Sequence, residues 1–234
     1  MAILVSVVHA GGTGGYEKGA EVTTIAVLGV GRVGSAVART AIRAGYDVLV
    51  AGSGPAEDIA LLAQIVMPGA VAMTSAEAAG AADIVILAVP LHKHRSVDPA
   101  PLAGKVVIDA MNWWTPVDGS GDDPDRDDTR TSEVVAQHFD RSRLVKSLNH
   151  IGYHDLEEHS TPAGTPGRRA LAIASDDEEA ARLVAEILDG FGFDAVYAGP
   201  LDCGRFFGPG TRIFTSALTR DELEASLPAA ELAR

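Results

Sequence analysis

Short apolar runs alternate with longer mixed segments along most of the chain. The run at 25–28 precedes a helix-forming segment that ends near Gly45, and apolar runs recur at 46–51 and 82–90. The last of these is almost wholly apolar, which is typical of a strand covered by helices on both faces. Further strands are expected at 70–73, 105–109, 144–148, 170–174 and 193–198. This alternation predicts an α/β fold, namely a Rossmann-type doubly wound, mostly parallel sheet with a small C-terminal α/β extension.

The segments between the strands are predicted to be helical, at 55–66, 75–79, 131–138, 175–191 and 220–227. In the fourth of these, Ser175 to Glu178 has the form of a capping box and is expected to begin the helix. We expect an N-terminal extension at 1–22 and a dinucleotide-binding Rossmann domain at 23–148. A small C-terminal domain at 149–234 is expected to close the side of a second ligand and to supply a dimer contact.

Composition narrows the class of protein. The 234 residues are 47% hydrophobic and 22% charged, which is ordinary for a soluble globular protein. A net charge of −13 argues against nucleic-acid binding, which needs clustered Lys and Arg. No apolar run is long enough to span a bilayer, and the apolar start of the chain lacks the basic flank of a secretory signal. With a single cysteine, Cys203, the sequence fits a reducing compartment, so we expect a cytoplasmic protein without a membrane partner.

The glycine-rich turn Gly29-x-Gly31-x-x-Gly34 lies between the first strand and the first helix. In such a turn the first glycine allows a sharp bend, the second lets a pyrophosphate approach the backbone, and the third lets the helix pack on the sheet. The helix N-terminus then offers N–H groups and partial positive charge to phosphates. Dinucleotide binding is the favoured interpretation, and a purely structural turn is the alternative.

The end of the second strand bears on which dinucleotide binds. An acid there would bind the ribose 2′-hydroxyl of NAD, but this chain has Gly52-Ser53-Gly54-Pro55 and no carboxylate until Glu57. Ser53 can donate a hydrogen bond to a 2′-phosphate, so the pattern favours NADP(H). Arg32 could add positive charge at a phosphate or be solvated.

Polar and aromatic residues follow two later strands, where a second ligand would lie. Asn112 and Trp113 follow one strand end, and Asn149, His150 and Tyr153 follow the other. The alternative for the tryptophan is packing at an interface. Histidine pairs at 92/94 and 150/154 lack a zinc-site pattern, and the Asp-rich segment 119–130 lacks calcium-loop spacing, so we expect no metal site.

Several motifs together resemble one family. Besides the glycine turn, they are Val-Ile-Asp-Ala-Met-Asn112, Val-Lys-Ser-Leu-Asn-His150 and Ala-Gly-Pro-Leu201. The chain, over about residues 24–210, is similar to the coenzyme F420-dependent NADP oxidoreductase family. Two positions depart from the family pattern: Gly54 replaces an arginine, and Leu91 replaces an aromatic residue.

The resemblance implies roles for individual residues. Those implied to hold the pyrophosphate are Gly29, Gly31, Arg32, Val33 and Gly34. Ser53 would meet the 2′-phosphate, and Val89 and Pro90 would line the ribose and nicotinamide. The implied floor beneath the nicotinamide and deazaflavin rings is Asn149, His150, Ile151 and Gly152. A homodimer formed through the C-terminal part is also implied.

The predicted function is hydride transfer between NADP(H) and a deazaflavin such as coenzyme F420. Because the two cofactors carry this chemistry, no protein nucleophile is required. One alternative is a module that only binds NADP(H). Another is a reductase of a small carbonyl or imine, which needs a proton donor, for which His150 and Tyr153 are the candidates.

Overall fold

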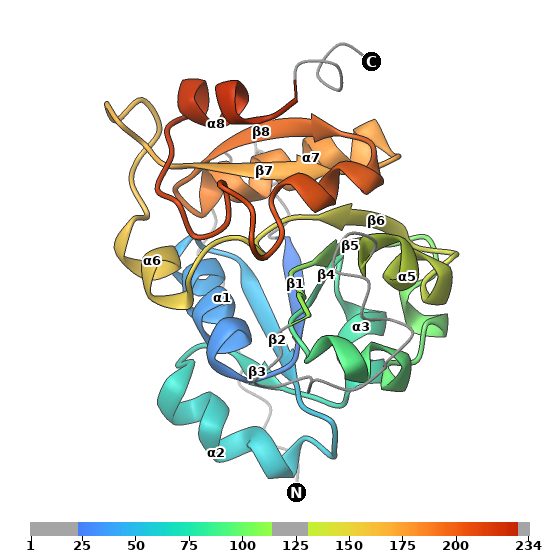
Figure 1. The fold of residues 1–234 in the computed structure, drawn as a ribbon. Helices are drawn as coiled ribbons and strands as arrows, with labels where there is room; N and C mark the ends of the chain where they lie inside the picture. The colour runs from blue at the N-terminus through green and yellow to red at the C-terminus, as the bar shows by residue number, and fades with distance from the viewer. Residues whose placement is uncertain (1–22, 114–130, 229–234) are drawn as a thin grey trace, which may run out of the picture.

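The computed structural model describes residues 23–113 and 131–228, and their core is one eight-stranded sheet (Figure 1). The strand order is β3-β2-β1-β4-β5-β6-β7-β8. The strands are β1 (Thr24–Leu28), β2 (Asp47–Ala51), β3 (Val71–Ala72), β4 (Ile84–Leu87), β5 (Val106–Asp109), β6 (Arg143–Lys146), β7 (Ala170–Ala174) and β8 (Asp194–Gly199).

Strands β1 to β6 pair in parallel, and the order reverses direction at β1, as in a doubly wound sheet. Strand β7 pairs with β6 in the antiparallel sense, through Lys146 and Ala174, and β8 is parallel to β7. The predicted fold class is confirmed, and the C-terminal extension continues the same sheet. The division into domains at residue 148 stays a prediction.

Helices cover both faces of the sheet. They are α1 (Arg32–Arg43), α2 (Glu57–Val66), α3 (Ser75–Ala81), α5 (Thr131–His138), α6 (Tyr153–Glu158), α7 (Glu178–Gly190) and α8 (Arg220–Ser226), with the 3-10 helices η1 (Leu91–Ser96), η2 (Ala100–Leu102) and η3 (Leu201–Phe206). No helix within the described ranges is long and apolar enough to cross a membrane.

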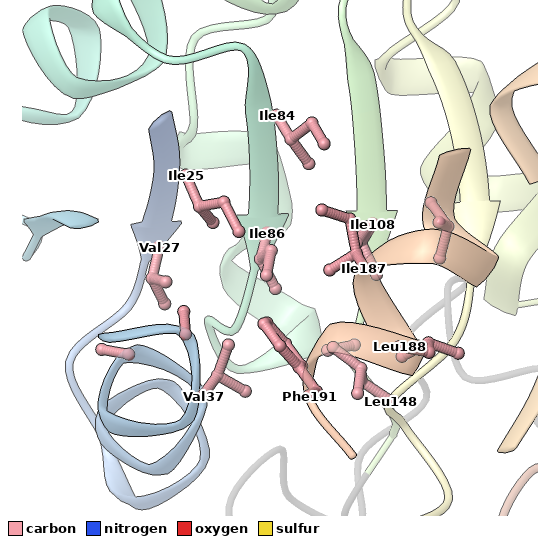
Figure 2. Packing of buried hydrophobic residues seen from close by; sticks show 14 of the residues in the cluster. Ile25, Val27, Val37, Ile84, Ile86, Ile108, Leu148, Ile187, Leu188 and Phe191 are labelled. Atoms are coloured by element: carbon pink, nitrogen blue, oxygen red, sulfur yellow. The ribbon is translucent and has the colours of Figure 1, made fainter. Parts of the chain in front are cut away.

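Alternate residues of each central strand enter different cores, as the period of two in a strand requires. From β1, Ile25 and Val27 join the core beneath α1 and α7, where Phe191 is also buried (Figure 2). Ala26 and Leu28 join the opposite core with α3 and α5. Both faces are thus covered, which explains the unbroken apolar runs in the sequence.

The start of α7 differs from the predicted capping box. Asp177 caps the helix, because its carboxylate accepts a hydrogen bond from the Ala180 N–H at 2.9 Å. Ser175 lies before the cap and donates to the Leu144 carbonyl at 2.7 Å, tying this loop to β6. The capping box was predicted two residues too early, because Ser175 and Asp177 are both residue types that suit an N-cap.

Some predictions fall outside the described residues. These are the extension at 1–22 and the whole Asp-rich segment 119–130; Trp114, which follows Trp113, also lies outside the described residues.

Candidate functional site

The register of the parallel strands brings the predicted site residues to one edge of the sheet. Leu28 pairs with Leu87, Leu87 with Asp109, and Asp109 with Lys146. The segments that follow these four residues therefore leave the sheet side by side. They contain the glycine turn, Val89 and Pro90, Asn112, and the run from Asn149 to Gly152. Ligands of open parallel sheets bind beyond this edge.

The glycine turn is packed as its motif predicts. Gly29 has φ 111°, and a Cβ there would lie 2.5 Å from the Ala88 carbonyl oxygen. A Cβ at Gly34 would lie 1.8 Å from the carbonyl oxygen of Gly29, so helix and turn touch without side chains between them. At Gly31, a Cβ would meet nothing within 4 Å. Two glycines are required by protein packing, whereas Gly31 faces open space.

The N-terminus of α1 is open to an anion. Gly31 is the N-cap and supplies no side-chain hydrogen bond, and the first turn contains no acid. The first regular bond of the helix runs from Ser35 N–H to the Gly31 carbonyl, so the N–H groups of Arg32, Val33 and Gly34 have no partner inside the helix. These residues fit the pyrophosphate of a dinucleotide.

Arg32 connects this helix to the C-terminal part of the chain. Its guanidinium carbon lies 5.9 Å from the centre of the Tyr153 ring, and it forms no ion pair with another described residue. Further along α1, Arg39 and Glu157 of α6 form an ion pair at 2.6 Å. Helix α6 is thereby fixed beside α1, with its first residue, Tyr153, next to the glycine turn.

A buried ion pair links the ends of β5 and β6. Lys146 Nζ lies 3.1 Å from Asp109 Oδ2 and also donates to the Met111 carbonyl. The second Asp109 oxygen accepts the Met111 N–H at 2.9 Å. Neither residue was predicted as part of the site. The signal was present, because a lysine and an aspartate each interrupt an apolar strand next to a predicted ligand segment.

Asn112 and Asn149 bind each other across the two strand ends. Asn112 Nδ2 donates to the Asn149 carbonyl at 2.5 Å, and Asn149 Nδ2 donates to Asn112 Oδ1 at 3.0 Å. Asn149 also donates to the Phe207 carbonyl at 3.4 Å. Phe207, which the sequence did not single out, packs edge-on against His150 with ring centroids 4.9 Å apart. The side-chain amides of Asn112 and Asn149 together form a fixed polar surface, the amide floor.

His150 holds that floor in place. It is 2% exposed, and its Nε2 accepts the Ala172 N–H at 3.0 Å. The ring proton is therefore on Nδ1, which donates to Asn149 Oδ1 at 3.2 Å. Burial, with the charges of Arg169 and Lys146, lowers the pKa of His150 to about 3. The imidazole is neutral at physiological pH, and both of its nitrogens are occupied within the protein.

The turn before His150 has an unusual backbone conformation. Leu148 has φ 62°, a left-handed conformation that residues other than glycine rarely adopt. Contacts on both sides stabilise it: the Ser147 hydroxyl donates to the Ala172 carbonyl at 2.8 Å, and Thr215 N–H donates to the His150 carbonyl at 2.9 Å. This conformation aims the Asn149 side chain at Asn112.

The remaining predicted residues divide between surface and core. Ser53 is exposed at the end of β2, and Val89, Pro90 and Gly152 are half-buried at the ligand edge. Ile151 is buried in the core with α1 and α7. Trp113 is 4% exposed and packs in the opposite core, so its role is packing rather than ligand contact.

The histidine pairs proposed and rejected as metal ligands have different environments. His94 is buried and its Nδ1 bonds to the Leu91 carbonyl at 2.7 Å. His154 is exposed and stacks near Tyr153. The part of the chain that the structure describes contains no group of three or more His, Cys, Asp or Glu side chains that could hold a metal ion.

Comparison with known families decides which kind of dinucleotide site this is. Residues 24–113 match the family described as NADP oxidoreductase, coenzyme F420-dependent. These residues make up less than half of the chain, and over them the chain is similar to the domain of this family. The resemblance seen in the sequence is confirmed over these residues, and so is the prediction of an NADP-linked oxidoreductase. The matched residues end at Trp113, so the match includes the glycine turn and Ser53 but not the segment around His150.

Solved structures share the fold over more of the chain. A hypothetical protein from Sinorhizobium meliloti is 27% identical with a TM-score of 0.71, over 85% of this chain and 96% of that protein. A candidate F420-dependent NADP-reductase from Arthrobacter sp. FB24 is 23% identical with a TM-score of 0.67, over 77% and 86%. An imine reductase from Pseudomonas sp. is 19% identical with a TM-score of 0.55, over 80% and 59%. Among curated proteins, no sequence matches this chain.

Proposed function

We propose that this protein transfers a hydride between NADP(H) and a deazaflavin of the coenzyme F420 type. The observation that supports this acceptor is the state of His150. Its Nε2 accepts a backbone N–H and its Nδ1–H is donated to Asn149, so it has no proton for a substrate. A deazaflavin accepts hydride at ring carbon and needs no protein acid at that atom.

Within this proposal, the protein binds and orients the two rings. The free N–H groups of Arg32, Val33 and Gly34 hold the pyrophosphate, and Ser53 donates to the 2′-phosphate. Asn112 presents its side-chain amide beneath the nicotinamide, in an orientation fixed by its bonds to Asn149, which His150 holds in turn. Hydride transfer requires the rings to stack about 3–3.5 Å apart with water excluded. His150 is thus a positioning residue, and not the proton donor suggested by its residue type.

Reduction of a small imine or carbonyl is the second candidate, and two observations favour it. Imine reductases have the same fold as this chain. Tyr153, half-buried beside Arg32, has a hydroxyl without a hydrogen-bond partner among the described residues. With His150 occupied, Tyr153 is the remaining proton donor of the two candidates.

Stopped-flow absorbance at the deazaflavin band separates the two functions. Mixing oxidised F420 with NADPH and protein is expected to bleach this band, and Tyr153→Phe is expected to keep most of the rate, because no protein proton is needed. A panel of cyclic imines and small aldehydes is assayed in parallel. The F420 proposal is wrong if saturating protein and NADPH leave the deazaflavin band unchanged. If the wild type oxidises NADPH in the presence of an imine and Tyr153→Phe loses this activity, the second candidate function would be established. Tight NADPH binding without turnover of any acceptor would identify a binding module.

A further inference from the structure

Asp58 and Gly54 approach each other closely beside the adenosine end of the site. A Cβ added to Gly54 would lie 2.7 Å from Asp58 Oδ2, so the Asp58 carboxylate occupies the space in which a side chain at position 54 would begin. Asp58 is exposed and lies in the first turn of α2. Its carboxylate has no hydrogen bond or ion pair with another described residue. A charged oxygen is therefore available beside the Ser53–Gly54 turn.

This turn lies against the glycine turn of β1. A Cβ on Gly52 would be 3.9 Å from the Val30 side chain and 3.0 Å from that of Ile59. Val30 stands between Gly29 and Gly31, and Ile59 follows Asp58 in α2. The Gly52 carbonyl is also held by the Ser75 hydroxyl at 3.1 Å. The 52–58 segment is thus fixed where the adenosine ribose of a dinucleotide bound at the glycine turn would lie.

The chemistry at this position is divided between two side chains. Ser53 can donate a hydrogen bond to a 2′-phosphate. The Asp58 carboxylate can accept hydrogen bonds from ribose hydroxyls but repels a phosphate. The segment Gly52-Ser-Gly-Pro-Ala-Glu-Asp58 contains no basic residue that would neutralise this repulsion. The sequence did not suggest this acid, because it follows the strand end by several residues and reaches the turn only through the start of α2.

We propose that Asp58 is a specificity-determining residue that limits the preference for NADP(H), so that the site also binds NAD(H). This inference rests on the proposed dinucleotide-dependent function and concerns the donor, whichever acceptor is used. A carboxylate close to a dianionic phosphate in water weakens the binding of that phosphate by about tenfold. Because the hydrogen bond from Ser53 favours the phosphate while Asp58 opposes it, the wild-type dissociation constants for NADPH and NADH are expected to lie within about tenfold of each other.

Direct binding tests this without any acceptor. Dissociation constants for NADPH and NADH are measured by calorimetry for the wild type and for Asp58→Asn, which keeps size and removes charge. The matched control is Glu57→Gln, which removes the same charge from the adjacent residue of α2. A second variant, Ser53→Ala, removes the hydrogen-bond donor to the phosphate. Thermal unfolding of each variant shows that it is folded, since an acid in a first helical turn also contributes modestly to helix stability.

Asp58→Asn is expected to raise the preference for NADPH over NADH about tenfold. The change is expected to be smaller at high salt, because screening already weakens the repulsion in the wild type. Glu57→Gln is expected to shift it by less than half as much, and Ser53→Ala is expected to shift it toward NADH. An Asp58→Asn ratio equal to that of the wild type, or an equal shift in Glu57→Gln, would overturn the role of Asp58 and leave the proposed function intact. Failure of both dinucleotides to bind the wild type would overturn both proposals.

Discussion

Lys146 Nζ lies 3.1 Å from Asp109 Oδ2, and their side chains are 2% and 0% exposed. The pair joins β6 to β5 at the last residue of each strand, where the segments carrying Asn149 and Asn112 begin. Removing two charges from water is costly, and the cost is offset here by bonds to both Met111 backbone groups. The ion pair therefore fixes the spacing between the two halves of the amide floor.

Breaking this pair is expected to destabilise the protein strongly. Lys146→Met leaves the Asp109 carboxylate buried without its cation, which typically costs about 3–5 kcal/mol. Urea unfolding measures the change in free energy. The control is Lys105→Met, because among the described residues Lys105 Nζ bonds only to the carbonyls of Gly80 and Ala82, at a partly exposed site. A loss below about 1 kcal/mol in Lys146→Met, no larger than an ordinary hydrogen bond, would show that the pair is not structurally important.

His150 predicts a specific pH dependence of stability. The pKa of this residue falls from an ordinary 6.5 to about 3 on folding. Between these values the unfolded chain binds a proton that the folded protein excludes. The contribution of the neutral His150 to the free energy of unfolding is fully present above pH 6.5. It is lost as the pH falls below this value, by about 1.4 kcal/mol per pH unit. His150→Gln is expected to lower stability at neutral pH but to reduce this slope.

Urea unfolding at several pH values between 4.5 and 7.5 measures the slope. His154→Gln is the control, because His154 is exposed and its removal leaves the buried imidazole unchanged. The interpretation of His150 as a buried neutral residue fails if the wild type and His150→Gln lose stability in parallel as the pH is lowered.

Much of the fold could be predicted because its signals are local. The apolar run at 25–28, the glycine turn and the spacing of later strands each determine nearby structure, and all agree with the parallel sheet. The roles of His150 and Trp113 could not be predicted, since they depend on partners far away in the sequence. Ala172 occupies one nitrogen of His150, and the second core encloses the Trp113 ring. Residue type suggested a proton donor and a ligand contact, whereas both side chains are buried, and we propose that His150 positions Asn149 while Trp113 packs in the core.

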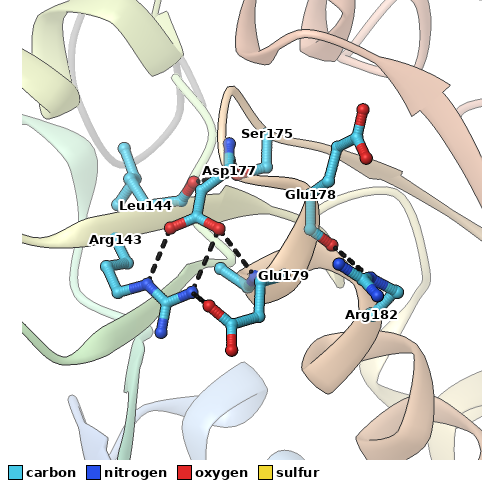
Figure 3. Close-up of polar contacts among 8 residues, drawn as sticks. Arg143, Leu144, Ser175, Asp177, Glu178, Glu179 and Arg182 are labelled. Atoms are coloured by element: carbon cyan, nitrogen blue, oxygen red, sulfur yellow. Dashed lines mark hydrogen bonds and ion pairs between the residues drawn. The ribbon is translucent and has the colours of Figure 1, made fainter.

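The junction of β6 and α7 gives a prediction about helix capping. Asp177 binds Arg143 Nε at 2.6 Å as well as the Ala180 N–H, and Glu179 binds the same guanidinium at 2.9 Å (Figure 3). The hydrogen bonds that Asp177 accepts from Arg143 and from the Ala180 N–H lower its pKa to about 2, with the Arg143 contact as the larger cause. Asp177→Ala is expected to cost about 1 kcal/mol, the usual value of an N-cap.

The matched control is Glu179→Ala. Its carboxylate touches the same arginine but is 79% exposed and caps nothing, so its removal is expected to change stability by less than about 0.5 kcal/mol. Thermal and urea unfolding of both variants measure the difference. Equal losses would assign the stability to the ion pairs and not to the cap.

Two glycines of the same turn are expected to respond differently to alanine. Gly34→Ala puts a Cβ 1.8 Å from the Gly29 carbonyl oxygen, so turn and helix must separate, and a melting temperature several degrees lower is expected. Gly31→Ala meets no protein atom within 4 Å and has an ordinary φ of −73°. It is expected to fold with wild-type stability but to bind NADPH at least tenfold more weakly, because the methyl group stands where the pyrophosphate approaches.

Calorimetry of NADPH binding and thermal unfolding, applied to both variants, separate packing from ligand contact. Wild-type NADPH affinity in Gly31→Ala would place the dinucleotide away from this turn and overturn the site.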